Sequence, residues 1–294
     1  MRKLFEQDCG RLTTMAIAIG FAGLSAAGCT EPREASAPQS VETAQPTETG
    51  TLEFRANGED FVRQGFVSKD GWQIDFDHLY VTLSEVKAYQ ADSPDDPEAK
   101  EADVSQVVEV PEQTTVDLAA GGEQADPVLV AAVEAPVGQY NALSWEMVPA
   151  ASGPAAGSTL KLVGNATKGN ETIPFTVQLD PEYAYSCGEY VGDGRKGLLS
   201  ANDLADVEAT FHFDHIFGDG EAAADDPINT GAVGFEPMAA LASDGALMAD
   251  MTALKQGLSP QDYSRLEEAL VGLGHVGEGH CSEVSAAHDH EHDG

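Results

Sequence analysis

Trp72-Gln-Ile-Asp-Phe-Asp-His-Leu-Tyr80 is the stretch of the sequence that decides the fold class. Large or aromatic side chains stand at every second position, which is the period of a half-buried β-strand. On this alternation His78 shares a face with Ile74 and Phe76, so we expect the imidazole of His78 to point inward.

Short β-rich runs of the same kind continue from residue 51 to about residue 218, separated by Gly, Pro, Asn and Asp. Lys168-Gly169-Asn170 stands between two of these runs and has the composition of a hairpin turn. No helical period recurs in this part of the chain. We therefore expect a mainly β fold, with a β-sandwich over residues 51–218.

Residues 219–282 have a different residue pattern, in which an acidic loop precedes segments with helical periodicity. Ser259-Pro260-Gln261-Asp262 combines an N-cap, a proline at the first helical position and a carboxylate that can close a capping box. Leu266, Leu270 and Leu273 then fall on one helical stripe. We expect a small C-terminal helical appendage docked on the sandwich.

Residues 1–28 have the pattern of a signal peptide. Basic residues precede the apolar run from Met15 to Leu24, which is too short to span a bilayer as a helix. The run ends in Ser25-Ala-Ala-Gly-Cys29, which resembles the lipobox of bacterial lipoproteins, although Ala26 stands where that family most often has Leu. The resemblance implies that Cys29 is acylated and becomes the new N-terminus.

Two expectations about location follow from the N-terminal region. The residue after the lipobox, Thr30, is not the aspartate that commonly retains such lipoproteins in the inner membrane, so the resemblance implies an outer-membrane anchor in the cell envelope. Residues 29–50 contain Val41 as their one large aliphatic side chain and are expected to form a disordered tether. The alternative is an ordinary secretory signal with Cys29 incidental, and this reading also exports the protein.

Two further motifs resemble a group of uncharacterised bacterial envelope lipoproteins that have a transthyretin-like β-sandwich. The motifs are Thr115-Val-Asp-Leu118 and Glu134-Ala-Pro-Val-Gly-Gln-Tyr140. The resemblance implies that Pro136 and Gly138 shape a turn and that Tyr140 begins a strand. It implies a fold and a location, and no activity.

The chain is strongly acidic, with a formal net charge of −35. The charged residues removed with the signal peptide are Arg2, Lys3, Arg11, Glu6 and Asp8, so the mature chain stays acidic. This charge makes nucleic acid and anionic lipid surfaces poor partners and cations good ones. Contact with the membrane is expected through the lipid anchor only, and a protein partner in the envelope stays possible.

The chain has four cysteines. Cys9 leaves with the signal peptide and Cys29 is assigned to lipid, which leaves Cys187 and Cys281 in an oxidising compartment. We expect these two to form a disulfide that holds the C-terminal segment on the body of the domain.

Eight histidines occur in the chain, and several stand near carboxylates. The tripeptide Phe-Asp-His occurs at His78 and again at His215, and the alternation of Val207, Phe211 and Phe213 places His215 on the apolar face of a predicted strand. The glycine-rich segment from His275 to Cys281 adds further donors. Imidazole and carboxylate ligands suit zinc or copper. The predicted inner ligands are His78, His215, His275 and His280, and the further candidates are His212, Asp214 and Glu278.

Two weaker metal-binding signals accompany this cluster. Residues 283–294 form a tail with His288, His290 and His292 alternating with carboxylates, and we expect it to be disordered and to capture metal weakly. The acidic residues Asp214, Asp219, Asp225 and Asp226 make residues 214–226 a possible calcium loop without EF-hand spacing.

The sequence predicts an exported, lipid-anchored protein that binds zinc or copper as a buffer, a chaperone or an accessory to uptake. The alternative is a structural or protein- or glycan-interaction module whose histidines are merely packed. The third reading is an enzyme, a metal-dependent hydrolase. It ranks third because the sequence holds no nucleophile elbow, phosphate loop or His-Glu-x-x-His motif.

Overall fold

The computed structural model describes residues 48–91, 104–188, 196–277 and 279–284. The predicted signal peptide, Cys29, most of the tether and the three tail histidines lie outside the described residues.

The first sheet has five strands and includes segments from both ends of the described chain. β1 lies between β13, to which it runs parallel, and β6, to which it runs antiparallel. In spatial order the strands are β16 (Gly279–His280), β15 (Gly274–Val276), β13 (Leu204–Phe211), β1 (Thr49–Asn57) and β6 (Val128–Pro136).

The second sheet has ten strands and is organised around the long strand β3 (Gln73–Ala91), whose first half pairs with β9 and whose second half pairs with β8. The main path is β14 (Leu247–Asp250), β10 (Glu171–Leu179), β9 (Leu160–Lys168), β3, β8 (Ala142–Met147), β11 (Tyr183–Cys187) and β17 (Ser282–Val284). The strands β2 (Phe66–Val67), β4 (Val104–Val110) and β5 (Thr114–Asp117) also pair with β3, while β7 (Gly138–Gln139) and β12 (Leu198–Leu199) form a separate pair.

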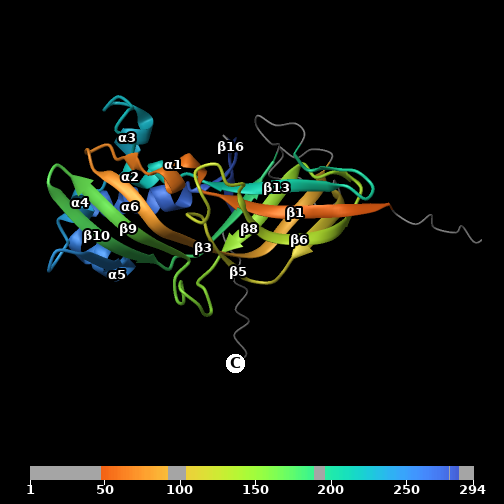
Figure 1. Ribbon diagram of the computed structural model, residues 1–294, viewed down its shortest axis with the longest axis horizontal. Helices are drawn as coiled ribbons and strands as arrows, with labels where there is room; N and C mark the ends of the chain where they lie inside the picture. Colours follow the sequence, from red (N-terminus) through yellow and green to blue (C-terminus); the bar gives the residue numbers. More distant parts are fainter. Residues whose placement is uncertain (1–47, 92–103, 189–195, 278, 285–294) are drawn as a thin grey trace, which may run out of the picture. The chain divides into compact units, whose positions relative to one another are not determined.

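One hydrophobic core fills the space between the two large sheets (Figure 1). Trp145 of β8 contacts Phe211 of β13 with ring centroids 6.0 Å apart, so the inner faces of the two sheets meet directly. Leu52, Phe54 and Leu143 are buried in the same core. The predicted mainly β, sandwich-like fold with small helices is confirmed.

The described helices are short. α6 begins as predicted, with the Ser259 hydroxyl accepting the Asp262 N–H at 3.1 Å, and buries Leu266 and Leu270. The helices are α1 (Glu59–Gln64), α2 (Asp214–Phe217), α3 (Pro227–Gly231), α4 (Glu236–Ala239), α5 (Met251–Gly257) and α6 (Pro260–Val271). Among the described residues, no helix has the length and apolar character needed to cross a membrane.

The turn motifs predicted from the sequence adopt the expected backbone. The β9–β10 hairpin turns at Gly169, whose positive φ of 63° favours glycine. Gly138 also has a positive φ, of 146°, and the Tyr140 hydroxyl donates to the Pro136 carbonyl at 2.9 Å. Pro136 ends β6 and Gly138 begins β7, so both residues lie at the predicted turn, whereas Tyr140 stands before β8, which begins at Ala142, and does not itself begin a strand.

The C-terminal segment joins both sheets as well as carrying helices. β15 extends the first sheet beside β13, and β17 extends the second sheet beside β11. The predicted disulfide between Cys187 and Cys281 is present, with the two Cα atoms 4.5 Å apart. The segment is therefore fixed by strand pairing and by a covalent link.

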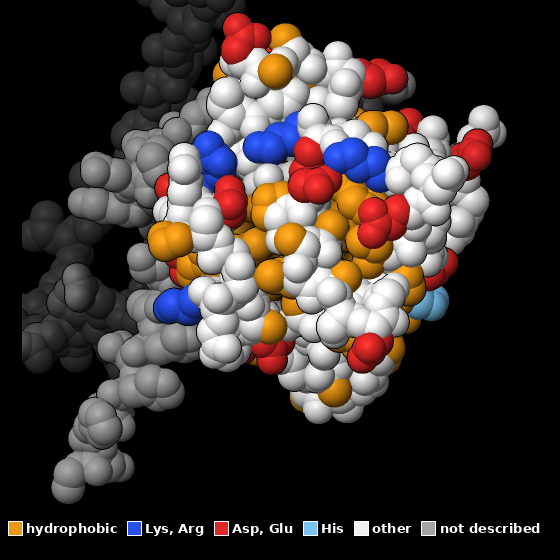
Figure 2. Space-filling view, turned by 90° about the vertical axis from the view of Figure 1, so that its left-hand side faces the viewer, with side chains coloured by type: hydrophobic (Ala, Val, Ile, Leu, Met, Phe, Trp, Pro, Cys, Tyr) orange, Lys and Arg blue, Asp and Glu red, His pale blue; other side chains and the backbone are white. Residues whose placement is uncertain are grey.

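The end of the second sheet where α4 and β10 lie is on the left-hand side of Figure 1. Figure 2 shows hydrophobic side chains gathered near the middle of this face, bordered by acidic and basic ones. The Lys168 amine lies 5.6 Å from the centre of the Trp72 ring and forms a 2.6 Å ion pair with Glu236.

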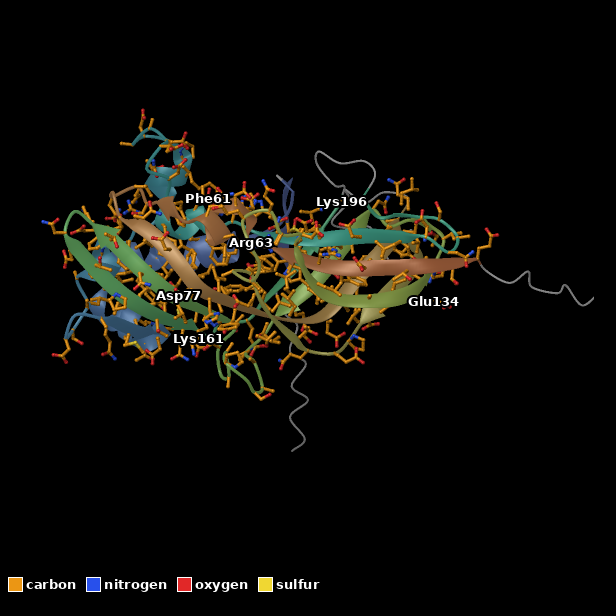
Figure 3. All side chains as sticks on the ribbon, viewed as in Figure 1. Phe61, Arg63, Asp77, Glu134, Lys161 and Lys196 are labelled. Atoms are coloured by element: carbon orange, nitrogen blue, oxygen red, sulfur yellow. A yellow bond between two sulfur atoms is a disulfide. The ribbon has the colours of Figure 1, made fainter. Side chains whose placement is uncertain are left out.

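The inward orientation predicted for His78 is wrong. The pairing of β3 with β9 shifts register between Phe76 and His78, so Asp77, labelled in Figure 3, takes an extra position in the strand. Because side chains alternate with a period of two, the bulge exchanges the faces of the residues after it. Leu79 is fully buried, and the His78 side chain is 51% exposed.

The strand predicted to run through His215 ends earlier. β13 stops at Phe211, and the chain turns into the helical turn α2, where the His215 N–H donates to the His212 carbonyl at 3.3 Å. Phe213 and Phe217 remain buried, so the apolar pattern is satisfied by a turn instead of by an extended strand.

Candidate metal centre

Three histidines from two distant segments meet at the end of the first sheet. Among the described residues, His212, His215 and His275 form the one set whose side-chain donor atoms lie close enough to hold an ion, all within 4.8 Å of one another. His275 is 1% exposed, and His212 and His215 are partly buried.

Strand pairing explains how the two segments meet. In the pairing of β13 with β15, Thr210 stands opposite His275 and Phe211 opposite Gly274. The His212 N–H then donates to the Leu273 carbonyl at 3.3 Å. His212 and His275 therefore come together because the hairpin after α6 adds to the edge of the first sheet.

The three imidazole rings are in direct contact. His212 and His275 are stacked, with centroids 3.9 Å apart and ring planes only 5° from parallel. His215 stands edge-on to His275, at 5.1 Å and 73°. Three protonated imidazoles packed this closely would repel one another, and the neutral imidazole is the form that binds metal.

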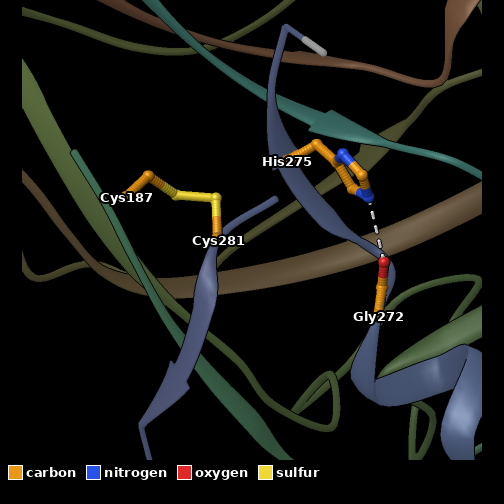
Figure 4. The surroundings of a disulfide bond; sticks show 4 residues. All are labelled: Cys187, Gly272, His275 and Cys281. Carbon is orange, nitrogen blue, oxygen red and sulfur yellow. Dashed lines mark hydrogen bonds between the residues drawn. A yellow bond between two sulfur atoms is a disulfide. The ribbon is translucent and has the colours of Figure 1, made fainter. Parts of the chain in front are cut away.

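A hydrogen bond fixes the tautomer of His275. Its Nε2 lies 3.1 Å from the Gly272 carbonyl oxygen (Figure 4). Because a carbonyl oxygen can only accept, Nε2 carries the hydrogen and Nδ1 carries the lone pair. Metal-binding histidines commonly have this arrangement, with one nitrogen donating to a backbone carbonyl and the other facing the ion.

The observed rings are close to a coordination geometry without having it. Zinc bonds of about 2.0–2.1 Å in a tetrahedral site place the ligand nitrogens about 3.4 Å apart. The lone pair of an imidazole nitrogen lies in the plane of its ring, so two parallel stacked rings cannot both direct lone pairs at one ion. Binding therefore requires the ring of His212 or His275 to rotate and the stack to open.

Two carboxylates accompany the cluster. Burial raises the pKa of the Asp214 carboxyl above its ordinary value; His215 and His212 act in the opposite direction, and Glu59 raises it further. The Asp214 Oδ1 atom is buried and accepts no hydrogen bond within the described part of the chain. Oε1 of Glu59 lies 3.3 Å from Nε2 of His212. Negative charge here favours a bound cation.

Glycines allow the hairpin to approach so closely. A Cβ atom at Gly274 would lie 2.5 Å from the Tyr185 ring, and one at Gly272 would lie 3.4 Å from Nδ1 of His215. The Cys281 N–H donates to the Gly274 carbonyl at 3.1 Å. This hydrogen bond connects a cysteine of the disulfide directly to β15, the strand that carries His275 (Figure 4).

His78 stands apart from this cluster. Its Nδ1 lies 2.7 Å from Oδ2 of Asp117, and its ring stacks on Tyr80 at 5.3 Å. It is not part of the group formed by His212, His215 and His275. The structure therefore brings together His215 and His275 of the four predicted inner ligands, with His212 from the further candidates.

The remaining predicted ligands cannot be placed. The backbone of His280 pairs with His275 across the β15–β16 hairpin. The side chain of His280, all of Glu278 and the tail residues His288, His290 and His292 lie outside the described residues.

The acidic loop is organised around a side-chain amide. Nδ2 of Asn229 donates to the carbonyls of Asp219, Ala222 and Ala223 at 2.8, 3.3 and 3.0 Å. These carbonyls are of the kind that a calcium ion would use, and here they already have a donor. Calcium binding by residues 214–226 stays a prediction without support from this geometry.

Glu59 and Gly272 are the site residues that sequence reasoning missed. Glu59 is the first residue of α1 and is distant in sequence from every histidine of the cluster. Only the pairing of β1 with β13 brings it near, and no local pattern encodes that pairing.

Comparison of the chain with protein-family models, curated proteins and solved structures finds no match. The functional conclusion therefore rests on the geometry of the site.

Proposed function

We propose that this protein binds a first-row transition-metal ion, zinc or copper, through His212, His215 and His275, and serves as a buffer, chaperone or uptake accessory. The observation that carries the proposal is the meeting of three imidazoles from two distant segments, within 4.8 Å of one another. Neutral imidazole is a preferred ligand of both ions. The fixed tautomer of His275 and the nearby Asp214 and Glu59 support a cation at this place.

The whole-chain charge supports the same function. A net charge of −35 attracts cations to the surface of the protein, although salt screens this attraction over about 8–10 Å. The imidazoles supply the selectivity, because exposed carboxylates also suit calcium and magnesium, whereas imidazole suits zinc and copper.

We also propose a cell-envelope location with lipid on Cys29, favouring the outer membrane. The support is the resemblance of Ser25–Cys29 to a lipobox and the presence of a disulfide, a bond typical of exported proteins.

The test of metal binding is calorimetric titration with Zn²⁺ and Cu²⁺ at neutral pH. The chain used carries His288→Ala, His290→Ala and His292→Ala, so that the tail contributes no imidazole; this chain is called the tail variant below. We expect one tight equivalent of metal. Binding should weaken below about pH 6, where imidazoles take up protons and leave the ion.

His275→Ala and His78→Ala, each added to the tail variant, form the matched pair. Loss of His275 should weaken binding at least about 100-fold, because one of three imidazole ligands is gone. Loss of His78 should leave the affinity unchanged, because that ring lies on the exposed side of β3 and outside the cluster. Equal affinities in the two variants would reject the proposed ligand set.

The second candidate is a structural or interaction module without metal. The stacking of His212 on His275 at 3.9 Å favours it, because this is a packing geometry and not a coordination geometry. If the tail variant binds neither ion more tightly than millimolar, this candidate takes the place of the first.

A further inference from the structure

Glu59 contacts the metal centre from a third segment of the chain. Its Oε1 lies 3.3 Å from Nε2 of His212, a buried atom. Glu59 is the first residue of α1, which follows β1, whereas His212 follows β13. The two residues meet because β1 and β13 run parallel and end together, with Asn57 opposite Thr210.

The backbone at Glu59 is held in an uncommon conformation. Its φ is +60°, in the left-handed region that residues other than glycine seldom occupy. Such a conformation persists only where the surroundings fix it, and it occurs often at functional sites. Here the Glu59 N–H donates to Oδ1 of Asn57 at 2.9 Å.

Asn57 is fixed in turn by the next polar residue along the sheet. Its Nδ2 donates to Oε1 of Glu208 at 2.8 Å, and the other oxygen of Glu208 accepts from Lys196. Figure 3 shows Lys196 beside β13. A row of hydrogen bonds thus runs from Lys196 to the backbone of Glu59 and fixes the position from which the Glu59 side chain reaches His212.

We propose that Glu59 is a positioning residue of the metal centre: it accepts the Nε2 hydrogen of His212 and thereby presents Nδ1 of that ring to the ion. The inference rests on the proposed function. A carboxylate is the usual outer partner of a metal-binding imidazole, where it sets the tautomer and makes the ring a stronger ligand. The observed contact of Glu59 with His212 is an ion-pair distance of 3.3 Å, whereas Nε2 of His275 is hydrogen-bonded to the Gly272 carbonyl at 3.1 Å.

Glu59 also has an ordinary role that any test has to separate from this one. A carboxylate in the first turn of a helix interacts favourably with the helix dipole. Asp60, the next residue, stands in the same turn of α1 and is exposed. Glu59→Gln and Asp60→Asn remove the same charge from the same turn, and only the first removes a carboxylate that faces His212.

The experiment measures Zn²⁺ affinity in the tail variant by competition with a chromophoric chelator. We expect Glu59→Gln to weaken binding by about 10–100-fold, the range typical of outer-sphere partners, and Asp60→Asn to leave it unchanged. Equal affinities in the two variants overturn the role of Glu59. Absence of Zn²⁺ binding in the tail variant itself overturns the proposed function, and the two failures are thus distinct.

A second measurement does not depend on any substitution at position 59. Nitrogen-15 NMR of the imidazoles in the metal-free tail variant, above the pH at which they are protonated, reports which nitrogen of His212 carries hydrogen. We expect Nε2–H. A Nδ1–H tautomer would mean that Nε2 offers its lone pair toward Glu59, and it overturns the assignment.

Discussion

Tyr183 and Tyr185 mark the place where the C-terminal strand joins the second sheet. Both belong to β11, with ring centroids 6.3 Å apart, and β17 pairs with this strand so that Glu283 stands opposite Tyr185. The Tyr185 hydroxyl donates to the Leu270 carbonyl at 2.9 Å and thus also ties α6 to the sheet. Burial raises the pKa of Tyr185 far above its ordinary value.

The raised pKa of Tyr183 predicts a loss of stability at alkaline pH. Burial, and next the nearby Glu283, raise the pKa of Tyr183 from 10.0 to about 12. Between these values the folded chain keeps a proton that the unfolded chain has lost, so the contribution is fully present below pH 10 and disappears as the pH rises toward 12. Tyr183→Phe should therefore flatten the decline in unfolding free energy over this range.

Urea unfolding at several alkaline pH values checks this prediction for Tyr183. The decline should become shallower without vanishing, because Tyr185 acts in the same direction. An identical decline in the wild type and in Tyr183→Phe would mean that Tyr183 ionises at the same pH in the folded and unfolded chains.

Single residues also explain where sequence reasoning about the site succeeded and failed. Periodicity correctly placed Ile74 and Phe211 in the core, because their strands are regular around them. It misplaced His78 because a bulge at Asp77 shifts the register by one residue, and no residue type announces that shift. His212 was ranked below His78, yet the turn after β13 directs it at His275.

At the scale of elements, the metal centre is made by a hairpin that adds to an existing sheet edge. β15 and β16 pair with each other, and β15 pairs with β13 through only two residue pairs. Such a short pairing holds weakly by itself. The link from Cys281 to Cys187, together with β17, supplies the remaining anchorage. The sequence predicted the disulfide, but it did not predict that the segment would join both sheets.

Removing the disulfide should therefore weaken both the fold and the metal centre. The bond closes a loop with a sequence separation of 94, for which chain entropy predicts a stabilisation of about 4–5 kcal/mol. The double variant Cys187→Ala/Cys281→Ala should lose stability of this order in urea unfolding. Its Zn²⁺ affinity in the tail variant should also fall, because β15 is then held by few hydrogen bonds.

Chemical reduction of the tail variant with both cysteines retained is the control for the double cysteine variant. It breaks the same bond and leaves both side chains, so its stability should follow that of the double variant. The two free thiols can themselves bind Zn²⁺, so the affinity is compared in the double variant, which lacks both. Undiminished Zn²⁺ affinity in the double variant would show that strand pairing alone positions His275.

For the whole molecule, all described residues belong to one compact unit, Pro46–Gly294. Its mainly β character could be predicted from the sequence, because the alternation of Trp72–Tyr80 and the turns at Gly138 and Gly169 are local signals. The meeting of His212 with His275 was not, because it depends on which strands become neighbours across a long stretch of sequence. Glu59 was missed for the same reason.

The metal centre and the proposed lipid anchor lie in separate parts of the chain, and they should be separable by experiment. The centre is built from residues after position 58, whereas Cys29 precedes the described residues. Acylation supplies the membrane affinity of an anchored protein, since each buried methylene contributes about 0.8 kcal/mol. Cys29→Ser in the tail variant should therefore move the protein from the membrane fraction to the soluble fraction, with unchanged Zn²⁺ affinity.

Cys9→Ser is the control for this fractionation, because Cys9 lies before the apolar run and outside the Ser25–Cys29 motif. It should leave the protein in the membrane fraction. If Cys29→Ser also stays there, the anchor is not on Cys29, and the lipobox resemblance has no chemical consequence. If Cys29→Ser releases the protein but lowers its Zn²⁺ affinity, the N-terminal region contributes to the metal centre. In that case His212, His215 and His275 are not the complete ligand set.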